Sequence, residues 1–290
     1  MNGAFNEVNE VIDLQSYLQG ETYEQQEFID SLIYRLHNFG FFYLKVKREL
    51  NDDIYHPNMF LERYITLFTD VLSEHPFLKL YMDAPTVDDG GYSLVFFPEV
   101  SDVDENIDYP DQPIESMLSL PLLWEWSRNK GLPKKIKNFL KGTEDIYHMI
   151  YKLSFILIDA LERGYNNQPG SLKKLFEKKN NGSVRFVKYH KPNCFTDIDN
   201  LNIHITEPTI PHIDKSFFSF NLGETSPGLF LIEDGKKQAL SIKSDCLLVT
   251  SGSYSEELTL DSKYPIRGFK HTVLNSVERI VGLGFVAPDF

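Results

Sequence analysis

Hydrophobic residues recur at two different spacings along this chain of 290 residues, and the change in spacing divides it into two parts. Up to about residue 180, apolar side chains return at every third or fourth position, which is typical of amphipathic helices. From about residue 183, short runs rich in Val, Ile, Phe and Thr alternate with turn residues, which is typical of β-strands. The pattern therefore predicts an α+β protein.

The first part contains two well-marked helices. Thr22 and Gln25 form a capping-box pattern ahead of one apolar stripe, and Gly40 ends that helix before a buried strand at 41–46. The other helix is predicted over 143–163. Its apolar stripe would also suit a partner-binding helix, but such a stripe more commonly packs on its own domain. Weaker patterns indicate a short strand at 11–14, a helix after Pro57, and a strand at 92–97 inside the Asp-, Gly- and Pro-rich stretch 83–113, which is expected to be an extended surface loop.

The strand-like runs of the second part predict a β-sandwich or jelly roll, because many short strands follow one another with turns between them. The runs are 183–190, 216–222, 228–234, 238–252, 269–275 and 278–288. Neither an internal repeat nor a low-complexity linker separates the helices from the strands. We therefore expect residues 1–290 to form a single domain, with about 1–180 as helical support and pocket mouth and about 181–290 as the core.

Composition narrows the classes of function. The formal net charge is −13, from 42 acidic and 29 basic residues, so the chain lacks the basic surface that nucleic-acid binding needs. The two cysteines, Cys194 and Cys246, show no metal-binding or disulfide spacing, which suits a reducing compartment. We see no signal peptide, and the most apolar run, 153–158, is too short to span a bilayer. A cytoplasmic protein without nucleic-acid or membrane partners is expected.

A possible metal site begins with His212 and Asp214, which are separated by one residue. In a strand, residues two apart project to the same face, so both can reach one ion. Because a His-x-Asp triplet occurs by chance in a chain of this length, a third ligand is needed. His271 has the best context: it lies in a strand-like run with Phe269 and Val273 on its own face, at 271 − 214 = 57 residues from Asp214. Two histidines and one carboxylate form the facial triad of non-haem Fe(II) oxygenases.

Arg279 follows His271 by eight residues, in an apolar strand-like run. Burying an arginine is costly unless it meets an anion, and a carboxylate is the best partner for its guanidinium. A dicarboxylate co-substrate that reaches from the metal would supply that carboxylate. The alternative is an ion pair with an Asp or Glu of the chain itself.

In order and spacing, six segments together resemble the isopenicillin N synthase-like branch of the iron(II)/2-oxoglutarate-dependent oxygenase superfamily. They are "VIDLQSYL", "FIDSLIYRLHNFGFFYLKV", "VRFVKYHKPN", "HID…SPGLFLIEDGK", "DCLLVTSGSYSEELT" and "HTVLNSVERIV". The resemblance covers nearly the whole length. It implies a double-stranded β-helix (jelly-roll) core flanked by N-terminal helices.

The resemblance also implies roles for individual residues. His212, Asp214 and His271 match the iron ligands, and Arg279 matches the residue that binds the distal carboxylate of 2-oxoglutarate. Tyr189 falls where family members often place a second contact to that co-substrate, although it is equally suited to be a core tyrosine. Related halogenases have a small residue in place of the aspartate, so the presence of Asp214 indicates an oxygenase or oxidase.

The chain departs from the family pattern at three positions. The usual Arg-x-Ser is Arg-Ile-Val at 279–281, so Val281 replaces a hydroxyl that would bind the same carboxylate. A lost hydrogen bond to a charged group costs about 1.5–3 kcal/mol. Val187 stands where an asparagine is usual, which removes a second polar contact. Thr272 replaces an arginine between His271 and Val273, at a position that is expected to point away from the metal.

These observations lead to a main prediction and an alternative. The main prediction is a non-haem Fe(II)- and 2-oxoglutarate-dependent oxygenase that hydroxylates or desaturates a small organic substrate with dioxygen. The alternative, favoured by Val281 and Val187, is an Fe(II)-dependent oxidase of the same fold that does not use 2-oxoglutarate. In that enzyme Arg279 would bind a substrate carboxylate.

Two further classes remain open. A non-catalytic binding protein on the same scaffold is disfavoured, because it has no need of three metal-competent residues. A zinc hydrolase would use the same ligands, but the sequence does not nominate a general base for it. Substrate contacts are expected from the pocket mouth, including the loop 83–113, Phe218, Phe220 and the C-terminal residues 286–290, unless these apolar side chains belong to the core.

Overall fold

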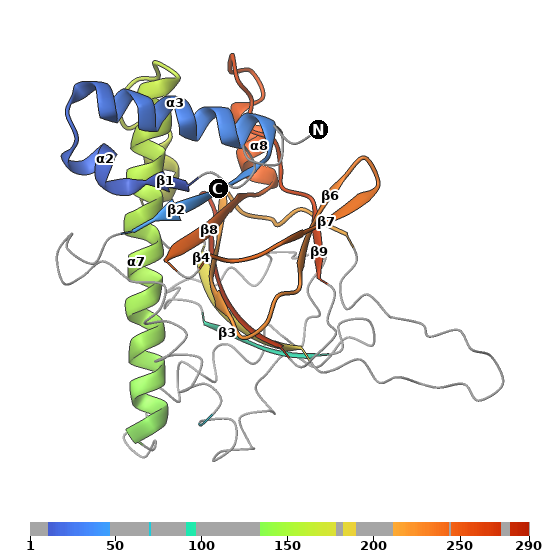
Figure 1. The fold of residues 1–290 in the computed structure, drawn as a ribbon. Helices are drawn as coiled ribbons and strands as arrows, with labels where there is room; N and C mark the ends of the chain where they lie inside the picture. Colours follow the sequence, from blue (N-terminus) through green and yellow to red (C-terminus); the bar gives the residue numbers. More distant parts are fainter. Residues whose placement is uncertain are drawn as a thin grey trace.

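The computed structural model describes residues 11–46, 70, 91–96, 134–177, 182–189, 211–243, 245–273 and 279–289. Two β-sheets and a set of helices make up these ranges, so the predicted α+β class is confirmed (Figure 1). The predicted helix after Pro57 and most of the loop 83–113 lie outside the described residues. No helix in the described ranges is both long and apolar enough to cross a membrane.

The large sheet has seven strands in the order β1-β2-β8-β5-β10-β4-β3. Only β1 and β2 run parallel, and every other neighbouring pair is antiparallel. The strands predicted at 11–14, 41–46 and 92–97 are confirmed to within a residue or two. The bounds are β1 (Val11–Asp13), β2 (Phe41–Lys45), β8 (Cys246–Ser251), β5 (Phe218–Glu224), β10 (Arg279–Val286), β4 (Gly182–Tyr189) and β3 (Gly91–Phe96).

The small sheet has three strands in the order β7-β6-β9, namely β7 (Lys236–Leu240), β6 (Leu229–Glu233) and β9 (His271–Val273). Asp234 and Gly235 connect β6 to β7 with φ angles of 49° and 73°. Positive φ at both central residues is the requirement of a type I′ hairpin turn, which an Asp-Gly pair meets easily. A single bridge between His212 and His271 extends this sheet by one residue on its β9 side.

Alternating side chains of the large sheet feed two separate hydrophobic clusters. In β2, Phe42 and Leu44 belong to one cluster, while Phe41 and Tyr43 belong to the other. The first cluster, which we call the outer core, joins the sheet to the helices. The second, the inner cluster, joins the large sheet to the small one through side chains such as Leu231 of β6. The strand period of two is thus used to build a support on one face and an interior on the other.

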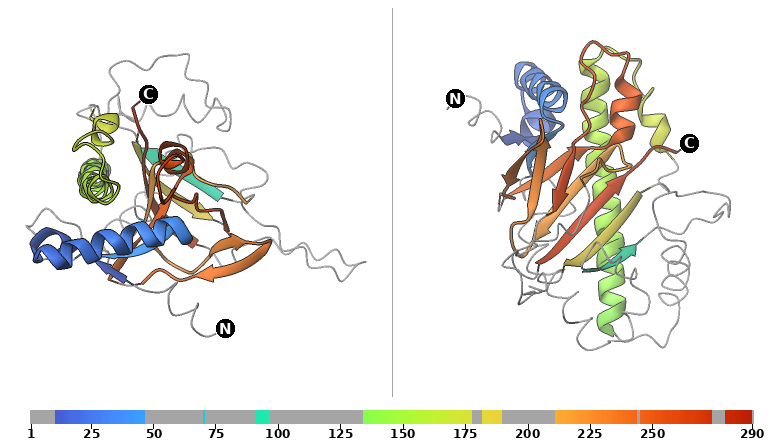
Figure 2. Two further views of the ribbon diagram at one scale, coloured as in Figure 1. Left: turned by 90° about the horizontal axis from the view of Figure 1, so that it is seen from above. Right: turned by 90° about the vertical axis from the view of Figure 1, so that its right-hand side faces the viewer.

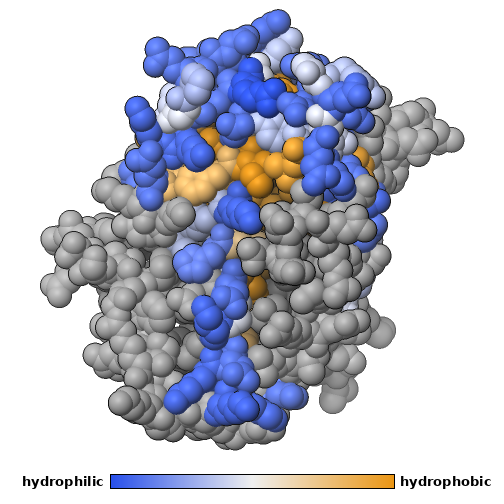
Figure 3. All heavy atoms as spheres, turned by 90° about the vertical axis from the view of Figure 1, so that its left-hand side faces the viewer, coloured by the Kyte–Doolittle hydropathy of each residue, from blue (hydrophilic) through white to orange (hydrophobic). Residues whose placement is uncertain are grey.

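The helices cover the outer face of the large sheet. In Figures 1 and 2, α7 runs along one side of that sheet, away from β6 and β7, and α3 crosses near its upper end. The helix predicted over 143–163 is confirmed but begins earlier, at Lys134, and its exposed residues recur at helical spacing. Figure 3 shows hydrophilic side chains along its exposed side. The helical bounds are α2 (Leu14–Gln19), α3 (Thr22–Asn38), α7 (Lys134–Gly164), η3 (Lys173–Phe176) and α8 (Ser253–Thr259).

The N-terminal cap of α3 lies one residue earlier than the sequence pattern predicts. Glu21 is the cap residue, with extended backbone angles, and its N–H donates to Oε2 of Glu24 at 2.7 Å. The prediction of a capping box at Thr22 and Gln25 is therefore wrong, because Thr22 already has helical geometry. A glutamate can accept the same backbone bonds that a threonine would.

Candidate metal centre

His212 and His271 are brought together by backbone pairing. The N–H of each donates to the carbonyl oxygen of the other, at 2.9 Å in both directions. Beyond His212 the chain leaves the ladder, and the carbonyl of Asp214 instead accepts from the N–H of Ser253 at 2.9 Å. The prediction that His212 and Asp214 share a strand is therefore wrong: one bridge residue and a loop bring their side chains together.

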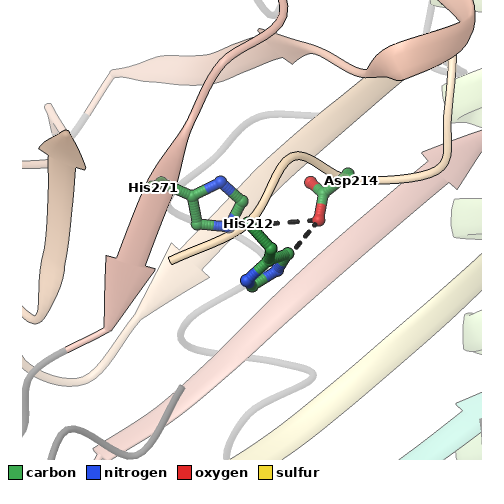
Figure 4. Close-up of side chains that lie close together, drawn as sticks. All are labelled: His212, Asp214 and His271. Carbon is green, nitrogen blue, oxygen red and sulfur yellow. Dashed lines mark ion pairs between the residues drawn. The ribbon is translucent and has the colours of Figure 1, made fainter. Parts of the chain in front are cut away.

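The three predicted ligands converge on one point (Figure 4). Oδ1 of Asp214 lies 3.5 Å from Nε2 of His212 and 3.9 Å from Nε2 of His271. The two imidazole rings have centroids 4.5 Å apart. The His212 side chain is 46% exposed, whereas those of Asp214 and His271 are 17% and 11% exposed. The centre is therefore buried on one side and open to solvent on the other.

The ring of His271 is held by contacts that leave Nε2 facing the centre. Nδ1 lies 3.2 Å from the carbonyl oxygen of Phe269, so an Nδ1–H donates to that carbonyl and the Nε2 lone pair faces Asp214. The Phe269 ring stacks on the imidazole at 5.2 Å with an interplanar angle of 19°. This is the usual way in which a protein orients a metal-binding histidine, through a bond from its second ring nitrogen.

The electrostatics of the cluster suit a cation. Burial opposes ionisation of Asp214, but His271, His212 and Ser219 outweigh it and lower the pKa of the carboxyl to about 2. Burial also lowers the pKa of His271, and His212 adds to that effect while Asp214 opposes it. Near neutral pH the cluster therefore offers a carboxylate and a neutral imidazole, which are the ionisation states that metal binding requires.

Gly252, between β8 and α8, allows the Asp214 loop to lie close to the large sheet. A Cβ atom at this position would stand 2.1 Å from the carbonyl oxygen of Ser216 and 2.6 Å from that of Asp214. Real side chains do not tolerate such distances. Gly252 was not among the residues predicted from sequence to position the site, although it stands in one of the segments that carry the family resemblance.

The cluster fits a single metal ion. Two atoms that each lie about 2.1 Å from one ion are at most about 4.2 Å apart. The two carboxylate–imidazole distances already meet that limit, and the three donor atoms all lie within 4.8 Å of one another. Among the described residues, this is the only group of His, Cys, Asp and Glu side chains that meets such a criterion.

Arg279, the predicted co-substrate ligand, is buried and bound to a carboxylate of the chain itself. Its Nη2 and Nε donate to Oε2 of Glu224 at 2.5 and 3.1 Å, and Nε also donates to the carbonyl of Ser226 at 3.0 Å. The Arg279 and Glu224 side chains are only 2% and 6% exposed. Of the two possibilities that the sequence left open for Arg279, the structure contains the internal ion pair.

A β-bulge places Glu224 on the inner face. In the pairing of β5 with β10, Leu283 opposes Asn221 and Gly282 opposes Gly223, so β5 carries one extra residue at that point. Glu224 consequently lies opposite Val281, whose side chain belongs to the inner cluster. Strict alternation along β5 would have placed Glu224 on the outer face, with Leu222, so sequence periodicity does not reveal it. A glycine inside the strand, at position 223, was the available signal.

The remaining predicted site residues have different outcomes. Val187 and Val281 are directly opposite one another across β4 and β10, and both belong to the inner cluster. The backbone of Tyr189 pairs with that of Arg279, but its side chain lies outside the described part, so its contact with a co-substrate stays a prediction. Phe218 and Phe220 belong to the outer core. Of the two places that the sequence left open for them, a pocket wall or the core, the structure contains the core.

The fold of this chain is similar to that of several solved structures. A Neurospora crassa protein, in complex with α-ketoglutarate (2-oxoglutarate) and 5-formyluracil, has a TM-score of 0.71 at 14% identity, over 97% of this chain and 85% of that one. The dioxygenase for auxin oxidation 1 from Arabidopsis thaliana, in complex with 2-oxoglutarate, gives 0.62 at 14% identity, over 97% and 93%. A putative 2OG-Fe(II) oxygenase family protein from Caulobacter crescentus also gives 0.62 at 14%, over 97% and 86%.

No protein-family model matches the sequence, and no curated protein matches it either. The structural matches nevertheless extend over nearly the whole chain and agree with one another. The likeness to these oxygenases that the sequence motifs indicate is confirmed at the level of architecture: this chain has the fold of the 2-oxoglutarate- and iron(II)-dependent oxygenases.

Proposed function

We propose that this protein is a non-haem Fe(II)- and 2-oxoglutarate-dependent oxygenase that hydroxylates or desaturates a small organic substrate. The observation that carries the proposal is the convergence of His212, Asp214 and His271 at one solvent-open point of this fold. Two histidines and a carboxylate are the ligand set of non-haem iron oxygenases. The 5-formyluracil bound in the Neurospora protein, and the auxin oxidation for which the Arabidopsis protein is named, support a small organic molecule as the substrate.

The residues of the candidate metal centre and the inner cluster each have a definite task in this proposal. His212, Asp214 and His271 would hold the metal, with His271 fixed by the Phe269 carbonyl. Iron bound there would supply the dioxygen chemistry that side chains alone do not provide. The inner cluster supplies apolar walls between the two sheets, which exclude water from the reacting groups. The open side at His212 is the side from which reactants would enter.

We further propose that residues 1–290 form one domain with a double-stranded β-helix (jelly-roll) core of the isopenicillin N synthase-like type. The outer core supports this, because side chains of α3, α7 and the large sheet share a single hydrophobic cluster. The large and small sheets enclose the inner cluster in the way that a jelly roll encloses its interior.

The proposal is tested by anaerobic reconstitution. Purified protein is loaded with Fe(II) under nitrogen and titrated with 2-oxoglutarate, and the near-visible absorption of the chelated 2-oxo acid is recorded. Oxygen is then admitted and succinate is measured across a panel of small organic substrates. Absence of both the absorption band and succinate would count against the proposal.

A second candidate is supported by the Arg279–Glu224 ion pair together with Val187 and Val281. In this case the protein is an Fe(II)-dependent oxidase that takes all electrons from its substrate and does not use 2-oxoglutarate. The predicted contact of Arg279 with a substrate carboxylate would require Glu224 to release it. Oxygen consumption without release of labelled carbon dioxide from 2-oxoglutarate would identify the oxidase.

A further inference from the structure

Glu224 occupies the part of Arg279 that an incoming carboxylate would need. Two donors on one edge of the guanidinium, Nε and Nη2, are directed at the same oxygen of Glu224. An edge with two parallel N–H donors is one through which arginine can bind a carboxylate with two bonds. A co-substrate carboxylate that docks on the same edge must first displace the one that is already there.

The surroundings of the pair reinforce this arrangement. Val281 on β10 is the direct neighbour of Glu224 in the strand register, and Val187 on β4 lies one strand further along the same row, so apolar side chains continue from the carboxylate across this face. A backbone bond from Ile242 also holds the Glu224 carboxylate. Tyr43, on β2, is turned to another partner, since its hydroxyl donates to the carbonyl of Ser241 at 2.9 Å. The described neighbours thus hold Glu224 in place beside Arg279.

Two carboxylates on one guanidinium would also repel one another. Burial strengthens that repulsion, because the interaction between charges grows as the surrounding dielectric constant falls. An apolar group in the same place has no such conflict and would contact valine side chains. The arrangement therefore discriminates between co-substrates by what they carry at the end remote from the metal.

We propose that Glu224 is a specificity-determining residue of the co-substrate pocket. It competes with the distal carboxylate of 2-oxoglutarate for Arg279, so the protein gains little from that carboxylate and also takes 2-oxo acids of the same length that end in an apolar group. This inference rests on the proposed function, since it assumes that a 2-oxo acid binds at the His212–Asp214–His271 centre. The bulge in β5 creates the competition, because it places Glu224 beside Arg279.

The test compares two ligands that differ only at the remote end. Fe(II)-loaded protein is kept under nitrogen, so that no turnover occurs, and is titrated with 2-oxoglutarate and with 2-oxopentanoate. Calorimetry gives the two dissociation constants, and the absorption of the chelate confirms binding at the metal. We expect the affinity of the wild-type protein for 2-oxoglutarate to exceed that for 2-oxopentanoate by less than about tenfold. The charge-assisted bond between the 2-oxoglutarate carboxylate and Arg279 is offset, because Arg279 must give up its bond to Glu224. A larger preference would overturn the proposal.

A matched pair of variants isolates the carboxylate of Glu224. Glu224→Gln keeps an acceptor oxygen for Arg279 but removes the competing charge, so we expect the preference for 2-oxoglutarate to rise by about tenfold. The affinity for 2-oxopentanoate should not change. Glu233→Gln is the control, because Glu233 pairs with Arg267 at 2.9 Å in an exposed position. It should leave both affinities as in the wild-type protein.

The outcomes separate this inference from the proposed function. If both 2-oxo acids bind and Glu224→Gln leaves their ratio unchanged, Glu224 does not compete for Arg279 and the inference is wrong, while the proposed function stands. If the iron-loaded protein binds neither 2-oxo acid, both are overturned. If Glu224→Gln does not fold, the ratio measured on the wild-type protein still decides, because it does not depend on any variant.

Discussion

The metal centre and the Arg279–Glu224 pair are two groups of ionisable side chains in the same fold, and they differ in how their charges are satisfied. At the metal centre, a carboxylate and two imidazoles face one another across gaps of 3.5 and 3.9 Å on an open side of the molecule. At the other site, a buried guanidinium and a buried carboxylate are in direct contact. In the proposed function the first site receives a metal ion, whereas at the second site the two charged groups already bind one another.

This difference shows a limit to inferring ligand-binding residues from sequence motifs. Sequence spacing pointed equally to the metal ligands and to Arg279, but the structure pairs Arg279 directly with Glu224. At the other site, the Asp214 carboxylate lies 3.5 and 3.9 Å from the two imidazoles around one point. A buried arginine that finds a glutamate within the fold is stabilised by it, and any ligand must then compete with the fold itself.

The largest effect is expected from breaking the closed site. Arg279→Leu leaves Glu224 buried without its cation, and loss of one partner of a buried pair costs about 3–5 kcal/mol of stability. Replacing both residues by leucine should restore most of that loss, since a well-packed apolar pair is often neutral. Urea unfolding measures all three proteins. Arg267→Leu, in the exposed pair with Glu233, should cost no more than about 1 kcal/mol. Equal losses of stability in Arg279→Leu and Arg267→Leu would contradict the expected difference between the buried and the exposed ion pair.

The open site is expected to be most sensitive to the backbone that supports it. Gly252→Ala places a methyl group against the carbonyl oxygens of Ser216 and Asp214. Because both atoms belong to backbone, the strain should reach the upper end of the range for overpacking, about 3 kcal/mol. Urea unfolding measures the loss, and an iron titration of the folded variant should show weaker binding. Gly170→Ala is a partial control, since no atom lies within 4 Å of its Cβ position, although its φ of 81° adds strain of its own.

The side chain of Asp214 should matter chiefly for the metal. Asp214→Ala removes the only carboxylate of the cluster, and we expect Fe(II) affinity to fall by more than about a hundredfold, since even residues that merely support ligands cost about 10–100-fold. Equilibrium titration with Fe(II) under nitrogen measures this. The exposed Asp261 provides a control, because its replacement by alanine should leave the affinity unchanged. Unchanged binding in Asp214→Ala would place the metal elsewhere.

The smallest effect concerns pH. Burial raises the pKa of Glu224 above its usual value of 4.5, although Arg279 opposes the shift. The folded protein therefore holds this proton to a higher pH than the unfolded chain does. The contribution of Glu224 to stability should then fall as pH rises above about 4.5 and level off above its folded pKa.

This dependence is measured as the difference in unfolding free energy between wild-type protein and Glu224→Gln from about pH 4 to about pH 8. The subtraction removes the titration of all other groups. A difference that increases with pH would show that Arg279 outweighs burial and that the pKa of Glu224 is lowered.

Much of the fold could be predicted because it depends on local pattern. The buried strand at 41–46 and the helical stripe of α7 are visible in the sequence and were confirmed. The metal ligands could be named because their chemistry requires a fixed set of residue types. Their local structure could not be named so well: His212 makes a single bridge rather than a strand, since the carbonyl of Asp214 bonds to Ser253 instead.

Glu224 illustrates what sequence alone does not provide. Its partner is 279 − 224 = 55 residues away, and a bulge of one residue decides which face of β5 it occupies. Phe218 and Phe220 show the same limit from the other side, because apolar residues suit a pocket wall and an outer core equally well. The choice between faces depends on tertiary pairing, which local periodicity does not encode.

The bridge between His212 and His271 also has a mechanical consequence. Within the part of the chain that the structure describes, two backbone hydrogen bonds join His212 to β9, and they close a loop of 271 − 212 = 59 residues. Because these bonds are few, the Asp214 segment can open locally while the sheets behind it stay folded. An ion bound by all three side chains would cross-link the two ends of that loop. Its binding free energy would be added to the free energy needed to open the loop. Backbone amides of the Asp214 segment should then exchange hydrogen more slowly when the metal is bound. When the metal is lost, this segment should open before the rest of the fold.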